Sequence, residues 1–418
     1  MKQRLALLTA LALGCGATVD GSRNTDAGTT PQDAPALPQD APSPPRDASP
    51  PGCRWTPTGP LRVLRSGGGA VLLAEAIATD SGAAVTVLDG DALRLLRVGS
   101  DGAPDPAQPT PIPLTTGPSP AVVNHLSMAW IAAPPRVEVL WEDPTAQAFC
   151  VWSQVDAAGA RTRAVMLDPM GIGFSLTGCR DLAVIDGARS FVSEQVRATW
   201  GHTLLALDDT GRATQRAVLP MTAGPPSAPL RRVALPDGGA LLWWTQVSSP
   251  RALLAQRVGP AGDALDVAHT VRAAMGETDD AQVVVTDEGP MALWTEISPP
   301  SMLPTRWAQP LTAMGAPQGP PIPWSALGTP VATAHATARG PEVVTATVVG
   351  SGVLRVVIQG WDARGVARGE AGQLSQETTP LPIHRVRVVA TPAGALVFVD
   401  GRLSSGEGGV VAVPIACR

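Results

Sequence analysis

The sequence carries a turn signal about every 52 residues, and this repeat constrains the fold more than any other feature. The signal is a glycine, in one case replaced by a proline, that follows a valine-rich run. Its seven positions are Gly82, Pro135, Gly187, Gly238, Gly289, Gly340 and Gly394. Self-similarity at a period of roughly 20–50 residues is typical of solenoids and propellers, in which each repeat is one supersecondary unit.

Each repeat has the pattern of four short strands. Around Gly82, for example, the runs 71–77 and 84–88 flank the turn, and a third run at 93–98 follows a polar loop. Val-rich runs bounded by Gly, Pro, Asp and Ser indicate strands. A second glycine series closes the third run, at Gly102, Gly159, Gly211, Gly262, Gly315 and Gly365. Two hairpins per repeat predict a four-stranded antiparallel blade, and seven repeats predict an all-β, seven-bladed β-propeller.

The seventh repeat has no second-series glycine, so its blade is one strand short. Its third run covers 410–417. An unpaired edge would be exposed there unless another segment covered it. We therefore expect the segment 55–65 to supply the missing outer strand and to close the ring by pairing with the C-terminal strand.

The first residues, 1–14, are typical of an export signal. Two positive residues, Lys2 and Arg4, precede a nine-residue apolar run at 5–13. This run is too short to span a hydrocarbon layer of about 30 Å, so we interpret it as the core of a signal peptide. No other apolar run approaches 18 residues, so we expect no other membrane span.

The signal ends in Ala12-Leu13-Gly14-Cys15, which resembles the lipobox of bacterial lipoproteins. In that family the cysteine is diacylated and becomes the mature N-terminus, so the resemblance implies lipid attachment at Cys15. The alternative is an ordinary secretory signal cleaved near Ala17, which would discard Cys15.

Residues 15–52 have the composition of a disordered tether. The motif Pro-Gln-Asp-Ala-Pro occurs at 31–35 and again at 38–42, and the segment contains no aromatic residue. It cannot bury enough apolar surface to fold, and its prolines favour an extended chain. In its signal, tether and repeat the protein resembles bacterial envelope lipoproteins with a seven-bladed propeller, here over 53–418. The resemblance implies an exported protein that contacts the membrane only through its lipid anchor.

Cysteines of an exported protein are expected to pair. Cys53 and Cys417 flank the point where the ring should close, and we predict a disulfide between them. Cys150 and Cys179 are predicted to form a second bridge, between the second and third blades.

Composition excludes several functions. The net charge is −5 and only 16% of residues are charged, so the chain lacks the basic footprint of a nucleic-acid binder. The five histidines are scattered, with no pair at metal-ligand spacing, at His125, His202, His269, His335 and His384. We therefore expect no metal and no cofactor.

Several tryptophans, including Trp244 and Trp294, lie near the ends of second strands. We interpret them as filling the wedges between blades, where large side chains are needed. The alternative is an aromatic platform, because second strands end toward the loop face on which propellers bind ligands. The candidate binding face consists of these two tryptophans and of carboxylates that we expect on the same face. The carboxylates are Asp89, Asp91, Glu142, Asp143, Glu296 and Asp400.

These features favour a monomeric, non-catalytic binding or scaffolding module at the cell envelope, with a protein or glycan ligand. The alternative is an extracytoplasmic hydrolase or lyase that acts on a glycan or peptide through a pair of the loop carboxylates. A lectin-like array with one site per blade would repeat the same loop residue in each blade. The loops 89–91, 298–300 and 350–352 differ, which disfavours such an array.

Overall fold

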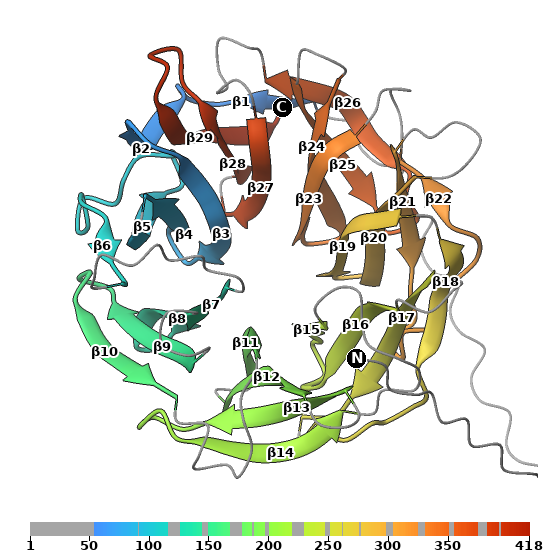
Figure 1. Cartoon of the computed structure of the whole chain (residues 1–418). Helices are drawn as coiled ribbons and strands as arrows, with labels where there is room; N and C mark the ends of the chain where they lie inside the picture. The colour runs from blue at the N-terminus through green and yellow to red at the C-terminus, as the bar shows by residue number, and fades with distance from the viewer. Residues whose placement is uncertain are drawn as a thin grey trace, which may run out of the picture. The chain divides into compact units, whose positions relative to one another are not determined.

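The computed structural model describes residues 54–90, 92–115, 126–143, 149–167, 178–185, 188–196, 200–219, 230–246, 251–260, 262–275, 277–297, 304–324, 331–350, 355–374, 383–392 and 394–418. Contacts divide the chain into two units, Met1–Ser49 and Pro50–Arg418, and every described residue lies in the second. All regular elements of the described residues are β-strands. Figure 1 shows the strands grouped into blades around a common axis.

Seven antiparallel sheets form the blades, which confirms the predicted all-β propeller. The innermost strands are β3 (Val71–Thr79), β7 (Leu126–Ala132), β11 (Gly178–Ile185), β15 (Arg231–Ala234), β19 (Glu277–Thr286), β23 (Val331–Arg339) and β27 (Ile383–Thr391). The second strands are β4 (Gly82–Asp89), β8 (Pro135–Asp143), β12 (Ala188–Val196), β16 (Ala240–Gln246), β20 (Gly289–Ile297), β24 (Glu342–Val349) and β28 (Gly394–Arg402).

The third strands are β5 (Ala92–Gly99), β9 (Phe149–Asp156), β13 (Trp200–Leu207), β17 (Arg251–Val258), β21 (Pro304–Pro310), β25 (Arg355–Asp362) and β29 (Gly408–Cys417). The outer strands of the first six blades are β6 (Ile112–Pro113), β10 (Arg161–Met166), β14 (Ala213–Leu219), β18 (His269–Met275), β22 (Ile322–Pro323) and β26 (Ala367–Leu374). Each of these six blades therefore pairs its strands in sequence order, from the axis outward.

The N-terminal strands β1 (Trp55–Pro57) and β2 (Arg62–Gly67) complete the seventh blade (Figure 1). Both pair antiparallel with β29, β1 along its last residues and β2 along its first half. The segment predicted to close the ring therefore does so, but as two short strands. Pro60 lies between them, and a proline cannot donate a ladder hydrogen bond.

The second glycine series forms the hairpin turns between third and outer strands. Gly211 is representative: its N–H donates to the carbonyl of Asp208 at 3.1 Å, and its φ is 86°. This left-handed backbone is open to glycine at no steric cost. The Asp208 carboxylate fixes the turn further, because its Oδ1 accepts the backbone N–H groups of Thr210 and Arg212. The recurring glycine in the sequence is thus a turn requirement.

The wedges between blades are filled with large apolar side chains, as the tryptophan pattern predicted. Trp294 of the fifth blade is 0% exposed and belongs to one core cluster with Leu241 and Trp243 of the fourth. Trp244 is 3% exposed and packs in the cluster that joins the third and fourth blades, with Val192. These clusters hold neighbouring blades together.

A disulfide links the second and third blades, as predicted. Cys150 on β9 and Cys179 on β11 are joined, with their Cα atoms 5.7 Å apart. Cys417 is also disulfide-bonded. Its predicted partner, Cys53, lies outside the described residues, as do Cys15 and the predicted signal and tether. Among the described residues no helix is long and apolar enough to cross a membrane.

Candidate functional site

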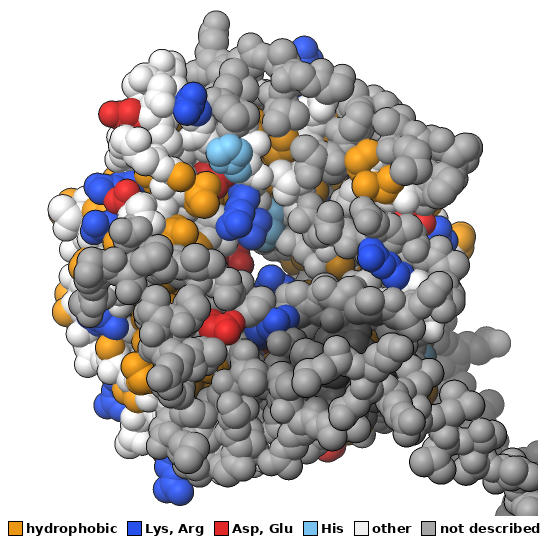
Figure 2. All heavy atoms as spheres, viewed as in Figure 1, with side chains coloured by type: hydrophobic (Ala, Val, Ile, Leu, Met, Phe, Trp, Pro, Cys, Tyr) orange, Lys and Arg blue, Asp and Glu red, His pale blue; other side chains and the backbone are white. Residues whose placement is uncertain are grey.

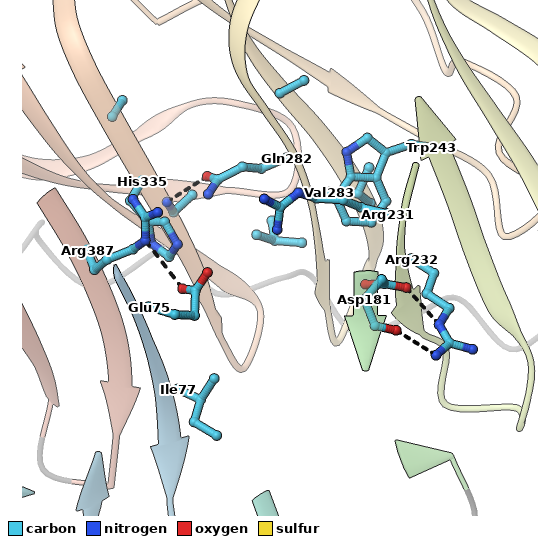
Figure 3. Close-up of a pocket in the computed structure, with 14 residues that line it drawn as sticks. Glu75, Ile77, Asp181, Arg231, Arg232, Trp243, Gln282, Val283, His335 and Arg387 are labelled. Carbon is cyan, nitrogen blue, oxygen red and sulfur yellow. Dashed lines mark hydrogen bonds and ion pairs between the residues drawn. The ribbon is translucent and has the colours of Figure 1, made fainter. Parts of the chain in front are cut away.

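A central cavity of about 410 Å³ is lined by Arg232 and by one polar side chain at a similar position in each of six innermost strands. The six residues of these strands recur at about the 52-residue spacing of the repeat and come from β3, β11, β15, β19, β23 and β27; they are Glu75, Asp181, Arg231, Gln282, His335 and Arg387. Figure 3 shows several of them around the cavity, and Figure 2 shows basic side chains gathered around the central opening. We call this set the channel layer.

β-Bulges in the innermost strands help to direct the side chains of the channel layer. The register of β3 shifts between Leu73 and Glu75, and that of β11 shifts next to Asp181. Asp181 also has a φ of 56°, which is uncommon for a residue other than glycine. A bulge breaks the strict in-and-out alternation of a strand and redirects a side chain. Irregular backbone therefore accompanies the polar residues.

Polar side chains of the innermost strands bond one blade to the next. In four cases within the described residues a side chain accepts the backbone N–H of the following blade: Ser127 Oγ from Leu182 at 2.8 Å, Gln282 Oε1 from Ala336 at 2.9 Å, His335 Nδ1 from Val388 at 3.2 Å, and Thr337 Oγ1 from Ala390 at 3.4 Å. Such bonds satisfy backbone groups that face the channel. They also fix which atoms of Gln282 and His335 remain free to meet a ligand.

The two carboxylates of the channel layer are held by arginines. Glu75 accepts from Arg387 Nε at 3.3 Å, and Asp181 accepts from Arg232 Nε at 2.7 Å (Figure 3). Burial raises the pKa of Asp181 against the opposing charge of Arg232, and burial lowers the pKa of Arg232. Each carboxylate is thus committed to a partner that restrains it.

Arg231 differs from its neighbours, because it is exposed and makes no hydrogen bond or ion pair within the described residues. Its guanidinium extends into the cavity in Figure 3. The charged residues of the cavity lining are three arginines, Arg231, Arg232 and Arg387, against two acids. The cavity therefore holds one unmatched positive charge, and Arg231 carries it.

His335 is neutral and offers a donor. Burial, followed by the charges of Arg387, Arg306 and Arg231, lowers the pKa of its imidazole well below the ordinary 6.5. Because Nδ1 accepts the N–H of Val388, the proton of the neutral ring is on Nε2. The Oε1 atom of Gln282 is likewise engaged with Ala336, which leaves the amide NH₂ as the free end of that side chain.

Two carboxylates of the predicted binding face form ion pairs with nearby arginines. Asp89 accepts from Arg65 Nε at 2.8 Å and from Arg94 Nε at 3.1 Å. Glu296 is 3% exposed and pairs with Arg272 at 3.2 Å. Both side chains hold strands together at the ends of second strands.

Asp400 is buried, which corrects its expected placement on an exposed loop face. Its side chain is 0% exposed; Oδ2 accepts the N–H of Leu73 at 2.8 Å, and Oδ1 accepts the N–H of Arg385 at 2.5 Å. Burial raises the pKa of this carboxyl, against the lowering effect of the two backbone donors. Asp400 therefore ties the seventh blade to the first.

The structure, where it describes the remaining predicted residues, does not bring them together in one site. Glu142 is buried, with 7% exposure. Asp143 ends β8, but its side chain lies outside the described part, as does Asp91. Trp244 and Trp294 lie in the wedges and not on the expected exposed platform. No group of three His, Cys, Asp or Glu side chains that could hold a metal occurs in the described part.

A sequence pattern that could have predicted the channel layer is a polar residue at a regular distance before the turn glycines. Each residue of the channel layer lies five to seven positions before a turn glycine of the first series. Glu75 in the run 71–77 and Gln282 before 283–285 are examples. One polar residue at a similar place in most inner strands indicates a shared surface, here the channel.

The fold and the cavity define a seven-bladed β-propeller with a polar central site. Among solved structures, the BP39L lectin from Burkholderia pseudomallei is similar, with 16% identity and a TM-score of 0.52 over 87% of this chain and 96% of the lectin. A puromycin-hydrolyzing peptidase from Mycobacterium tuberculosis shows 14% identity and a TM-score of 0.53 over 82% of this chain and 50% of the peptidase. At these identities the likeness shows the fold alone. No protein-family model and no curated protein matches the chain.

Proposed function

We propose that the protein is a non-catalytic binding module of the bacterial cell envelope, which takes its ligand in the central cavity. One observation carries this proposal: the cavity presents free donors, whereas its two acids are held by arginines. Arg231, the Nε2–H of His335 and the amide NH₂ of Gln282 are donors open to a ligand. Free hydrogen-bonding groups around a cavity suit recognition.

The same carboxylates bear on the alternative of a hydrolase or lyase. Such chemistry needs an acid and a base that can exchange protons with a substrate. Glu75 is paired with Arg387, and Asp181 is paired with Arg232. Because each acid is restrained by an arginine, we favour binding without turnover.

Placement at the envelope rests on the sequence. The disulfide between Cys150 and Cys179 agrees with a location outside the cytoplasm. Lipid attachment at Cys15 and a tether over 15–52 would hold the propeller at the membrane surface. Mass spectrometry of the mature N-terminus tests this part: a diacylated Cys15 supports it, and cleavage near Ala17 contradicts it.

The binding role is tested by incubating the full chain with arrays of glycans and peptides and recovering each bound ligand. We expect at least one ligand to be retained and to be recovered chemically unchanged. Recovery of cleaved ligand, with turnover that depends on Glu75 or Asp181, would support the enzyme instead.

A further inference from the structure

The unmatched charge of the cavity indicates the sign of its ligand. Arg231 is the charged lining residue without a partner in the described part of the chain, and its charge contributes to lowering the pKa of His335. It also acts on Asp181, so it lies within electrostatic range of groups from two other blades. An anion placed near Arg231 would neutralise this charge in a partly enclosed space, where the attraction is stronger than in water.

The donors near Arg231 suit a carboxylate. A guanidinium is a planar fork that binds a carboxylate through two parallel hydrogen bonds. Figure 3 draws the side chain of Gln282, from β19, between His335 and the guanidinium of Arg231. The Nε2–H of His335 adds a neutral donor from β23. With the guanidinium on the carboxylate, the donors of Gln282 and His335 are left for other polar groups of the ligand.

The rest of the lining suits a compact ligand with hydroxyl groups. Glu75 bonds Arg387 and the N–H of Ala76 through Oε1, and its Oε2 has no partner in the described part, so it can accept from a hydroxyl. Ile77 and Trp243 add apolar surface. A cavity of about 410 Å³ is at the small end of the range of about 300–1,000 Å³ found for ligand pockets.

We infer that the central cavity binds a sugar acid, whose carboxylate is anchored by Arg231 and whose hydroxyls meet Glu75 and His335. This inference rests on the proposed binding function and adds the chemical class of the ligand. It also names a specificity-determining residue, since Arg231 would separate an acid from the corresponding neutral sugar.

The first test compares glucuronate with glucose, which differ at one carbon by a carboxylate in place of a hydroxymethyl group. Isothermal titration of the full chain should show glucuronate binding at least about tenfold more tightly than glucose. Equal affinities would overturn the inference. Inorganic phosphate is the third probe, and it should compete with glucuronate weakly; competition at equal concentration would show a general anion site and overturn the assignment to carboxylate.

The second test uses variants of the anchor. Arg231→Ala should weaken glucuronate binding at least about tenfold, and Arg231→Lys, which keeps the charge but loses the fork, should weaken it at least about threefold. The control is Arg212→Ala, which removes an exposed arginine from an outer hairpin turn and should leave the affinity unchanged. Unchanged binding by both Arg231 variants would overturn the inference.

These outcomes can be separated from failure of the proposed function. If an array identifies a neutral ligand that binds without turnover and ignores Arg231, the binding module stands and the sugar-acid site is wrong. If glucuronate-containing glycans bind but are cleaved, the site stands and the non-catalytic role is wrong.

Discussion

The wedges between blades and the channel layer occupy neighbouring positions of the same repeat, yet they follow different chemistry. The wedges are filled by interchangeable apolar volume, such as Trp294 against Leu241. The channel layer, by contrast, holds six residues of five kinds at similar positions in the inner strands, from Glu75 to Arg387. Apolar packing asks only for size and shape, whereas each polar group near the axis needs its own partner. When the side chain at one position differs from repeat to repeat, that position is where single residues can have specific functional roles.

Within the channel layer a further contrast separates structure from recognition. Gln282 and His335 each accept a backbone N–H from the next blade. Arg231 does not join this set of bonds within the described residues. Variants in the two regions should therefore differ in whether they change stability or binding.

The largest effect is expected in a wedge. Trp55 is 0% exposed and belongs to the cluster that joins the sixth and seventh blades. Trp55→Ala should lower the free energy of unfolding by about 3–5 kcal/mol, because it removes a large buried side chain and leaves a cavity. Chemical denaturation measures this. The control, Val366→Ala, truncates a valine that is 60% exposed and should change stability by less than about 0.5 kcal/mol.

The next effect concerns a buried acceptor between blades. Asp400→Ala would leave the N–H groups of Leu73 and Arg385 without an acceptor, at about 1–3 kcal/mol each. Glu407→Ala removes an exposed acid from the same blade and serves as the control. Equal denaturation midpoints for the two variants would show that Asp400 does not hold the first and seventh blades together.

The buried imidazole of His335 should make the stability of the protein depend on pH. Its folded-state pKa lies well below the unfolded value near 6.5, so the unfolded chain binds the proton more readily. Stability that is present above this value is then lost as the pH falls through it, with a slope of up to about 1.4 kcal/mol per pH unit from this residue. His335→Gln keeps an acceptor for Val388 and should flatten the curve between pH 7 and about pH 5. A slope as steep as that of the unaltered protein would contradict this assignment.

The smallest effect is expected at Arg231. Arg231→Ala should change the free energy of unfolding by less than about 0.5 kcal/mol, because its guanidinium has no partner to lose in the described part of the chain. Thermal unfolding without ligand measures this. A decrease in the free energy of unfolding of more than about 1 kcal/mol would show that Arg231 has a structural role, as Gln282 does, and would contradict the proposed difference between the two residues.

The sequence predicted the scaffold well because its requirements are local. The turn at Gly211 needs a left-handed residue, and short valine-rich runs form strands wherever they occur. The pairing of Cys150 with Cys179 and the closing segment followed from counting blades. The site was harder to predict, because a bulge such as that at Asp181 changes which face a side chain takes, and nothing in the local pattern marks a bulge. Asp400 was misplaced for a related reason, since its strand β28 continues past it to Arg402 and its partners lie on other strands.

The pairing of β1 and β2 with β29 also governs when the protein can become a ring. Trp55 of β1 pairs with Cys417 of β29, so β1 can pair only after the residues up to Cys417 have been synthesised. During synthesis the six other blades can form from neighbouring segments, but the seventh cannot be completed in this way. Until β1 and β2 dock, the outer edge of β29 stays open to other chains. Ring closure is therefore the last assembly step that the topology allows. Before it, the open edge of β29 exposes the chain to aggregation with other chains.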